Sequence, residues 1–148
     1  MISFDSNILV YAADPSGGER RVRSADLVAR AMRGRGCTQP LQALCEFFNV
    51  ITRKAGVEAA AAAELVVAWS AAMRVEGARA EDLDAAMRAV IDYRLSFWDA
   101  MLWATVRRVG VRLLITEDFQ DGRVLEGVRF VNPFLPANDA LIEREIGR

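Results

Sequence analysis

The run Arg112-Leu113-Leu114-Ile115-Thr116, which ends at the acidic pair Glu117-Asp118, decides the fold of this 148-residue chain. Such a short apolar run between polar residues predicts a buried strand. The alternating stretch Ile2-Ser3-Phe4-Asp5 predicts an N-terminal strand, and Val128-Arg129-Phe130-Val131 predicts a late one. Because helical patterns separate these strands, we expect an α/β fold. The prediction is a three-layer α/β/α sandwich around a small, mostly parallel central sheet, formed by a single domain over residues 1–148.

Helical patterns fill the stretches between the strands. Ser6 is expected to cap the first helix, because a serine hydroxyl accepts a free N–H group of the first turn. Pro40 suits the first turn of a later helix, where its missing N–H costs nothing. Cys37-Thr38 is expected to form a very short strand. The predicted helices start at Asn7 and cover about residues 20–32, 40–54, 58–76, 81–94, 96–110 and 139–146.

Histidine is absent from the chain, and this limits the chemistry that it can perform. A Ser-His-Asp triad, a histidine-assisted cysteine nucleophile and imidazole metal ligands are all excluded. Cys37 and Cys45 lack the CxxC spacing of a zinc site, so we expect reduced, partly buried core residues. Catalysis by this chain would therefore rest on carboxylates and a hard cation.

The sequence shows no sign of a membrane segment. No apolar run approaches the roughly 18 residues that span a bilayer. No basic region precedes the apolar N-terminus, and Asp5 interrupts it, so a signal peptide is not expected. We predict a soluble, cytoplasmic protein. The formal net charge of −1 argues against a generally basic surface for nucleic acid.

Four acidic residues stand at separate boundaries or faces of the predicted elements. Asp5 and Asp118 follow predicted strands, and ligands of open α/β sheets bind beyond the carboxyl ends of the strands. Asp99 lies in Ser96-Phe97-Trp98-Asp99, where a helix begins, and Glu46 lies on the polar face of the 40–54 helix. Their joint placement predicts that the two helices bring their acids to the crevice at the strand ends.

Each acid also has a purely structural explanation. Asp5 and Asp118 suit turns or helix caps, which are common roles for aspartate. Asp99 fits a capping box, in which its carboxylate would reach back to the N–H of Ser96. Glu46 suits a solvated helix face. No single acid is decisive, and the functional interpretation depends on the four together.

Converging carboxylates favour phosphodiester hydrolysis assisted by Mg²⁺ or Mn²⁺. This reaction needs an activated water and neutralisation of charge on the phosphate oxygens, and divalent ions provide both. Magnesium prefers oxygen ligands, whereas zinc prefers the nitrogen and sulfur donors that are scarce here. Without a cation the carboxylates repel one another, so we expect raised pKa values and a gain in stability on metal binding.

The order and spacing of these motifs resemble the PIN-domain signature, in particular that of toxins of the VapC type. The resemblance implies a Mg²⁺- or Mn²⁺-dependent endoribonuclease that is paired with an inhibitory antitoxin. The apolar fraction of the chain fits a homodimer with a groove for an amphipathic antitoxin helix. The matching motifs are Asp5-Ser6-Asn7, Glu46, Ser96-Phe97-Trp98-Asp99-Ala100, Leu114-Ile115-Thr116-Glu117-Asp118-Phe119 and the ending at residues 125–134.

The resemblance also implies roles for individual residues. By position, the catalytic and metal-binding cluster would consist of Asp5, Glu46, Asp99 and Asp118. Asn7 would orient Asp5, Thr116 would place a hydroxyl near Asp118, and Asp121 is a candidate fifth acid, although Asp121-Gly122 is also a turn signal. RNA would be bound by local arginines, of which Arg53 is the first candidate. The others are Arg20, Arg21, Arg23 and Arg123.

Two other functions compete with this interpretation. A PIN-like protein could act only by binding partners, although here all four acidic positions are filled. A receiver-like phosphoacceptor domain also gathers acids and Mg²⁺ at strand ends. Such a domain needs a lysine on a late strand, however, and the only lysine, Lys54, falls at the end of a predicted helix.

Overall fold

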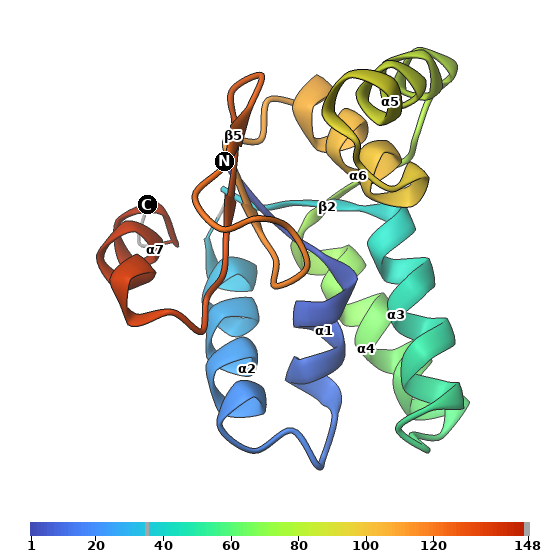
Figure 1. The fold of residues 1–148 in the computed structure, drawn as a ribbon. Helices are drawn as coiled ribbons and strands as arrows, with labels where there is room; N and C mark the ends of the chain where they lie inside the picture. The colour runs from blue at the N-terminus through green and yellow to red at the C-terminus, as the bar shows by residue number, and fades with distance from the viewer. Residues whose placement is uncertain (35, 147–148) are drawn as a thin grey trace.

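The computed structural model describes residues 1–34 and 36–146, which form two small sheets flanked by helices (Figure 1). The four-stranded sheet has the order β1-β4-β6-β5, in which the first three strands are parallel and β5 is antiparallel. The second sheet pairs β2 and β3 in parallel. The mostly parallel sheet predicted from the sequence is thus confirmed. The strands are β1 (Ile2–Phe4), β2 (Thr38–Pro40), β3 (Arg74–Glu76), β4 (Leu113–Ile115), β5 (Val124–Leu125) and β6 (Val128–Val131).

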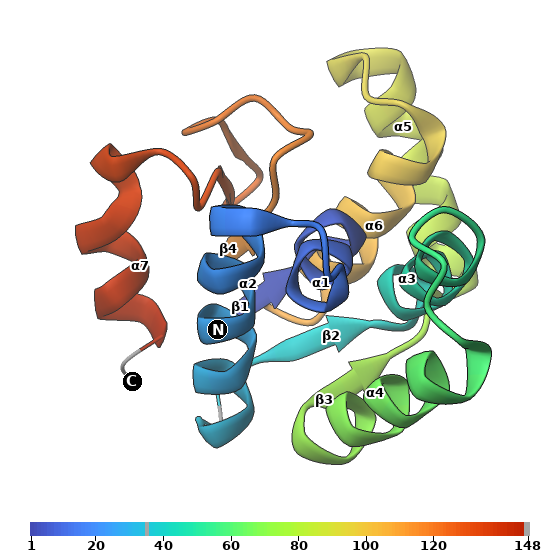
Figure 2. The same ribbon diagram turned by 90° about the horizontal axis from the view of Figure 1, so that it is seen from below.

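Helices cover both sides of the sheet. In Figure 1, α5 and α6 lie above the strands, α1 and α2 lie below them, and α7 lies beside α2; Figure 2 shows α1 between α2 and α3. This is the layered α/β arrangement that we expected. The helices are α1 (Ser6–Ala13), α2 (Gly18–Arg33), α3 (Leu41–Arg53), α4 (Ala59–Ala72), α5 (Ala80–Tyr93), α6 (Phe97–Arg108) and α7 (Asp139–Ile146), with a 3₁₀ turn at Pro136–Asn138.

Helix α6 passes through the core of the protein. Every residue from Ala100 to Val106 is buried, so the middle of this helix is covered on all sides, as central helices are. Trp103 is 1% exposed, and its indole N–H donates to the carbonyl of Leu125 at 3.2 Å. The buried helix fixes its own first turn, where Asp99 lies, relative to the sheet.

Several local predictions were wrong; Pro40, for example, ends β2 and precedes α3 instead of lying in its first turn. The helix predicted over 58–76 ends at Ala72, because residues 74–76 pair with β2 as a strand that tertiary contacts impose. Asp5, and not Ser6, caps α1. Cys37 is buried as expected, whereas Cys45 is exposed on α3; both are free thiols.

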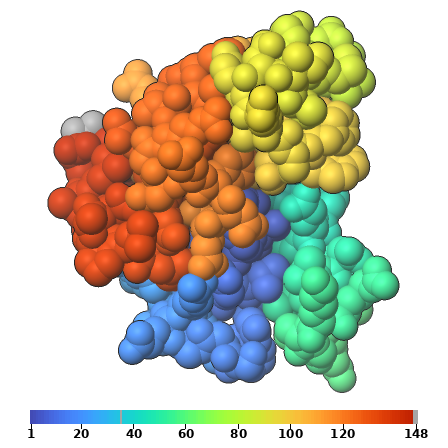
Figure 3. Space-filling view, viewed as in Figure 1, coloured from blue at the N-terminus to red at the C-terminus, as the bar shows by residue number. Residues whose placement is uncertain are grey.

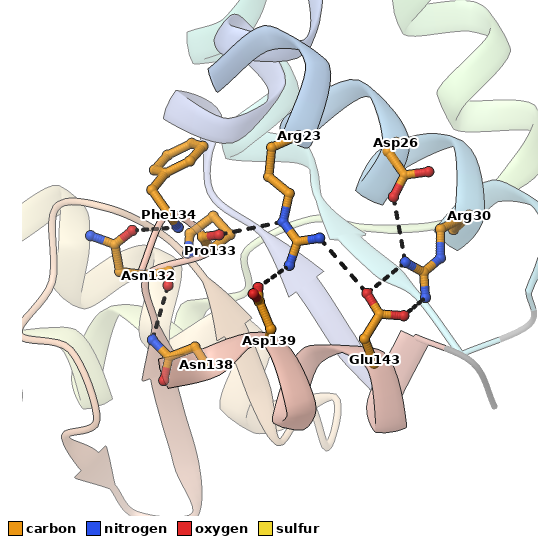
Figure 4. Close-up of polar contacts among 9 residues, drawn as sticks. All are labelled: Arg23, Asp26, Arg30, Asn132, Pro133, Phe134, Asn138, Asp139 and Glu143. Carbon is orange, nitrogen blue, oxygen red and sulfur yellow. Dashed lines mark hydrogen bonds and ion pairs between the residues drawn. The ribbon is translucent and has the colours of Figure 1, made fainter. Parts of the chain in front are cut away.

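The last helix is fastened to α2 by ion pairs (Figure 4). Arg23 contacts Asp139 at 2.7 Å and Glu143 at 3.7 Å, and Arg30 contacts Glu143 at 2.6 Å. Arg30 also pairs with Asp26, one turn earlier on α2. On this side of the molecule the acids of α7 therefore have arginine partners.

None of the helices in the described residues is both long enough and apolar enough to cross a membrane.

Candidate functional site

Asp5 is the buried centre of the candidate site. It directly follows β1, is 5% exposed and caps α1, since its Oδ1 accepts the N–H of Ser6 at 2.6 Å. Its Oδ2 accepts the hydroxyl of Thr116 at 2.7 Å and the side-chain amide of Asn7 at 3.3 Å. Asn7 and Thr116 thus surround Asp5. The carboxylate is held by donors on two neighbouring parts of the fold, α1 and the end of β4.

The surroundings of Asp5 oppose its ionisation. Burial raises the pKa of its carboxyl from the ordinary 3.8 to about 6, although the hydrogen bonds from Thr116 and Ser6 act to lower it. The negative charges of Asp118 and Glu46 raise the pKa further. Of the described residues, no arginine or lysine forms a salt bridge with Asp5 that would offset this cost.

Glu46 is joined to Asp5 through a single side chain. The hydroxyl of Ser6 donates to Oε2 of Glu46 at 2.8 Å and lies 3.3 Å from Oδ1 of Asp5. On the other side, Gln42 donates its side-chain amide to Oε1 of Glu46 at 2.8 Å and to the carbonyl of Trp98 at 2.9 Å. This chain of contacts ties α1, α3 and the first turn of α6 together.

Asp99 and Asp118 complete the acidic set. Asp99 is half-buried in the first turn of α6, where its N–H donates to the Ser96 hydroxyl at 3.3 Å. Burial raises the pKa of Asp99, the contact with Ser96 lowers it, and the charges of Asp118 and Glu46 raise it. Asp118 is exposed after β4, and its N–H donates to the Thr116 hydroxyl at 3.2 Å.

The structure thus brings four predicted acids to one end of the sheet. Among residues 1–34 and 36–146, none of the four carboxylates has an ion-pair partner. The same described residues contain no group of three or more acidic or cysteine side chains close enough to hold a metal ion jointly. In Figure 3, the dark blue N-terminal part of the chain shows at the surface between the teal α3 and the orange segment that follows β4. The four acids are electrostatically coupled but not packed into a closed metal cage.

The remaining predicted site residues lie outside this network. Asp121 accepts the N–H of Asn132 and the side-chain amide of Asn138, both at 2.8 Å, so it holds the C-terminal segment. Arg53 is exposed at the last position of α3. Arg20 pairs with Glu117, beside Asp118 in the chain.

Two residues contribute to the site in ways that the sequence did not predict. Ser6 was expected to cap a helix but instead links Asp5 to Glu46. Gln42 lies four residues before Glu46 on α3, and this spacing puts the two side chains on adjacent turns. Its second contact, with the carbonyl of Trp98, depends on tertiary packing and leaves no signal in the sequence.

Comparison of the sequence with family models assigns the class of protein. The model described as the PIN domain matches residues 2–124, well over half of the chain. The chain therefore belongs to the PIN domain family. No curated protein matches its sequence significantly.

Solved structures share its fold, among them a toxin of the VapC type. VapC20 of Mycobacterium tuberculosis, a toxin that cleaves the sarcin–ricin loop, has a TM-score of 0.65 and 22% identity, covering 80% of this chain and 90% of that one. A toxin–antitoxin complex from Klebsiella pneumoniae has a TM-score of 0.65 and 19% identity, covering 90% and 98%. PAE2754 from Pyrobaculum aerophilum has a TM-score of 0.65 and 18% identity, covering 99% and 96%.

Proposed function

We propose that this protein is a metal-dependent endoribonuclease that acts as the toxin of a toxin–antitoxin pair. The observation that carries the proposal is the gathering of Asp5, Glu46, Asp99 and Asp118 without a cationic partner among the described residues. They lie beyond the carboxyl ends of β1 and β4, where α/β sheets bind ligands. Membership of the PIN domain family and the fold shared with VapC20 support this choice.

The donor set suits Mg²⁺ or Mn²⁺. It consists of carboxylate oxygens, the ligands that hard cations prefer. A bound cation would neutralise charge on the phosphate oxygens and favour formation of a hydroxide nucleophile. Magnesium commonly keeps several of its waters and contacts only one or two carboxylates directly. The spacing of the acids, too open for three to hold one ion jointly, is compatible with such a hydrated ion.

We assign each acid a role according to the hydrogen bonds that hold it. Asp5 is fixed by Ser6, Thr116 and Asn7, so it would be the anchoring ligand. Glu46 is oriented by Ser6 and Gln42 and would be the second ligand, beside Asp5. The more accessible pair, Asp99 and Asp118, would face the RNA phosphate. Asp121 is held by its own contacts and stays outside the proposed cluster.

A protein partner follows from the same assignment. One of the similar solved structures is a toxin–antitoxin complex, so we propose a cognate antitoxin that inhibits this chain. A homodimer and a cytoplasmic location remain predictions from the sequence.

The test is RNA cleavage by the purified chain in Mg²⁺ or Mn²⁺, with EDTA as the metal-free control. Asp99→Asn should lower the rate by about 100-fold or more, because even groups that only orient metal ligands contribute about 10- to 100-fold. Asp139→Asn, which changes an acid paired with Arg23, should cleave as the wild type does. Full activity of Asp99→Asn would contradict the proposal.

Two results would favour the competing functions. Failure of the wild type to bind Mn²⁺ in calorimetry would indicate a PIN-domain protein that acts only through partners. Labelling by a small phosphodonor would indicate a phosphoacceptor. The position of Lys54, exposed at the C-terminal cap of α3 rather than on a late strand, argues against the second.

A further inference from the structure

One of the three tryptophans is exposed, and it stands at the start of α6. Trp69 and Trp103 are 5% and 1% exposed, whereas Trp98 is 64% exposed. Its neighbour Phe97 is 41% exposed, and the two rings meet edge to face with centroids 5.1 Å apart. A helix that is fully buried over its next two turns thus begins with an aromatic pair on the surface. What sets this pair apart from singly exposed apolar residues is that its two rings are contiguous, which makes it a candidate interaction site.

The backbone of this aromatic pair adjoins the acidic site. Trp98 directly precedes Asp99, so their Cα atoms are about 3.8 Å apart. The carbonyl of Trp98 accepts the side-chain amide of Gln42, which also holds Glu46. The backbone of Trp98 is therefore joined to two of the four proposed metal-binding acids, and the aromatic pair borders that site.

Two arginines flank the same turn. Arg94 has a left-handed backbone (φ 57°) that turns the chain from α5 toward Ser96, the cap of α6. Arg123 reaches the same turn, with its guanidinium 3.4 Å from the carbonyl of Tyr93. Within the described part of the chain neither arginine forms an ion pair, whereas Arg20 and others are paired with acids.

We propose that Phe97 and Trp98 form a stacking platform for an unpaired RNA base, with Arg94 and Arg123 contacting the neighbouring phosphates. The inference rests on the proposed ribonuclease function and assigns the residues that hold the RNA strand beside Asp99. Unstacked bases of RNA loops are recognised by stacking on aromatic side chains, which a base inside a duplex does not offer. Stacking tolerates any base, while arginines track the phosphates.

Charge favours RNA over a second copy of the chain as the occupant. A two-fold contact places the same patch of both copies face to face. Centred on this aromatic pair, it would bring the guanidinium groups of Arg94 and Arg123 in both copies close together, and like charges oppose association. An RNA strand offers the complementary pattern, with apolar base faces for the rings and phosphates for the arginines.

Tryptophan fluorescence provides a direct test, because Trp98 is the exposed tryptophan. The intact chain is titrated with a short unstructured oligoribonucleotide in EDTA, which prevents metal-dependent cleavage. RNA should quench the emission and protect it from acrylamide, whereas inorganic polyphosphate should give no such protection. Trp98→Ala should weaken RNA binding by roughly 5- to 100-fold, and Trp98→Phe should keep most of it. Val67→Ala, which changes an apolar side chain 68% exposed on α4, should leave binding unchanged.

The outcomes separate the platform from the ribonuclease function. Binding by Trp98→Ala equal to that of the wild type would overturn the platform, even if both proteins cleave RNA in Mg²⁺. Binding that depends on Trp98 without cleavage in Mg²⁺ would support the platform and contradict the nuclease. A different result would assign the aromatic pair to a contact between two copies of the chain. In that case Trp98 would be shielded from acrylamide before RNA is added, and ultracentrifugation would show a dimer that Trp98→Ala converts to a monomer. Binding of no RNA by the wild type would overturn the platform as well.

Discussion

Two buried aspartates in this protein have opposite surroundings. Asp82, in the first turn of α5, is 2% exposed and accepts Nε of Arg108 at 2.9 and 3.0 Å, together with the N–H of Arg79 at 2.8 Å. Asp5, which caps α1, is 5% exposed and is held by uncharged donors such as Thr116. Two further acids lie near Asp5, and in the described residues no guanidinium pairs with it.

The difference shows that this fold supplies a counter-charge at one buried acid and omits it at the other. A buried charge is costly unless it is paired. At Asp82 the pairing joins α5 to α6, and Arg108 also donates to the carbonyl of Gly77 before α5. At Asp5 the missing counter-charge leaves a site that a cation from solution would stabilise. We therefore infer a structural role for the first region and a ligand-binding role for the second.

The largest expected change follows from removing the counter-charge of Asp82. Arg108→Met should lower the free energy of unfolding by about 3–5 kcal/mol, because a buried carboxylate is left without its partner. Urea unfolding followed by circular dichroism measures the change. Arg144→Met, which breaks the exposed pair with Glu145, is the matched control and should cost at most about 1 kcal/mol. Equal losses in the two variants would remove the distinction between the regions.

Supplying the missing charge at the acidic site should have the opposite effect. Mg²⁺ at 100 times its dissociation constant should raise the free energy of unfolding of the wild type by about 2.7 kcal/mol, since the ion binds only the folded state. Thermal unfolding with and without Mg²⁺ measures this gain. It should be lost in Asp5→Asn and kept in Asp139→Asn. An equal shift in both variants would place the ion elsewhere.

Neutralising Asp5 itself should stabilise the metal-free protein. The folded-state pKa of Asp5, about 6, lies above the ordinary 3.8, so between these pH values the folded state binds more protons than the unfolded state. Stability contributed by this group is therefore greatest at low pH and falls as pH rises through that window. A rise of this size corresponds to at most about 3 kcal/mol. Above pH 7, Asp5→Asn should recover only about 1–2 kcal/mol of this cost. The rest is lost because the new amide fits the Thr116 hydroxyl less well than the carboxylate does.

The measurement for Asp5→Asn is a set of urea titrations in EDTA from pH 4 to pH 8. The difference from the wild type should be small at pH 4 and grow toward pH 7. Asp82→Asn provides the comparison, because it breaks a charged pair and should destabilise the protein at neutral pH. A loss of stability in Asp5→Asn at pH 8 would show that hydrogen bonds outweigh the cost of the buried charge.

Local patterns in the sequence were sufficient to predict most of the sheet. The apolar runs of β1, β4 and β6 and the exact span of α7 follow from periodicity and breakers. Strand β3 was missed because Arg74–Glu76 has no strand pattern of its own and forms by pairing with β2. Strand β5, two residues long, likewise depends on pairing with β6.

The candidate site likewise has features that the sequence could predict and others that it could not. The positions of Asp5 and Asp118 after strands could be predicted, because strand ends are visible in the sequence. The sequence could not show that Ser6 would bridge Asp5 to Glu46, since that contact requires α1 and α3 to pack at one angle. The difference between Asp5 and Asp82 was also hidden, because Arg108 is 26 residues from its partner.

The smallest expected effect concerns Gln42, which positions Glu46 without belonging to the acidic set. Its amide holds Oε1 of Glu46 and the carbonyl of Trp98, so Gln42→Ala should leave the fold intact and let Glu46 move away from the other acids. We expect about a tenfold loss of Mn²⁺ affinity in calorimetry, the lower end of the range for groups that orient metal ligands.

Asn49→Ala is the matched control for Gln42, since Asn49 is an exposed residue of the same helix and the Thr52 hydroxyl contacts its backbone carbonyl, not its side chain. It should bind Mn²⁺ as the wild type does. Glu46→Gln sets the upper limit of the effect, because it removes the charge that Gln42 holds in place. If Gln42→Ala binds Mn²⁺ as Asn49→Ala does while Glu46→Gln loses the ion, Glu46 does not need Gln42 to position it. If all three bind equally, Glu46 does not contribute to the metal site, and the cation must be held from β1, β4 and α6 alone.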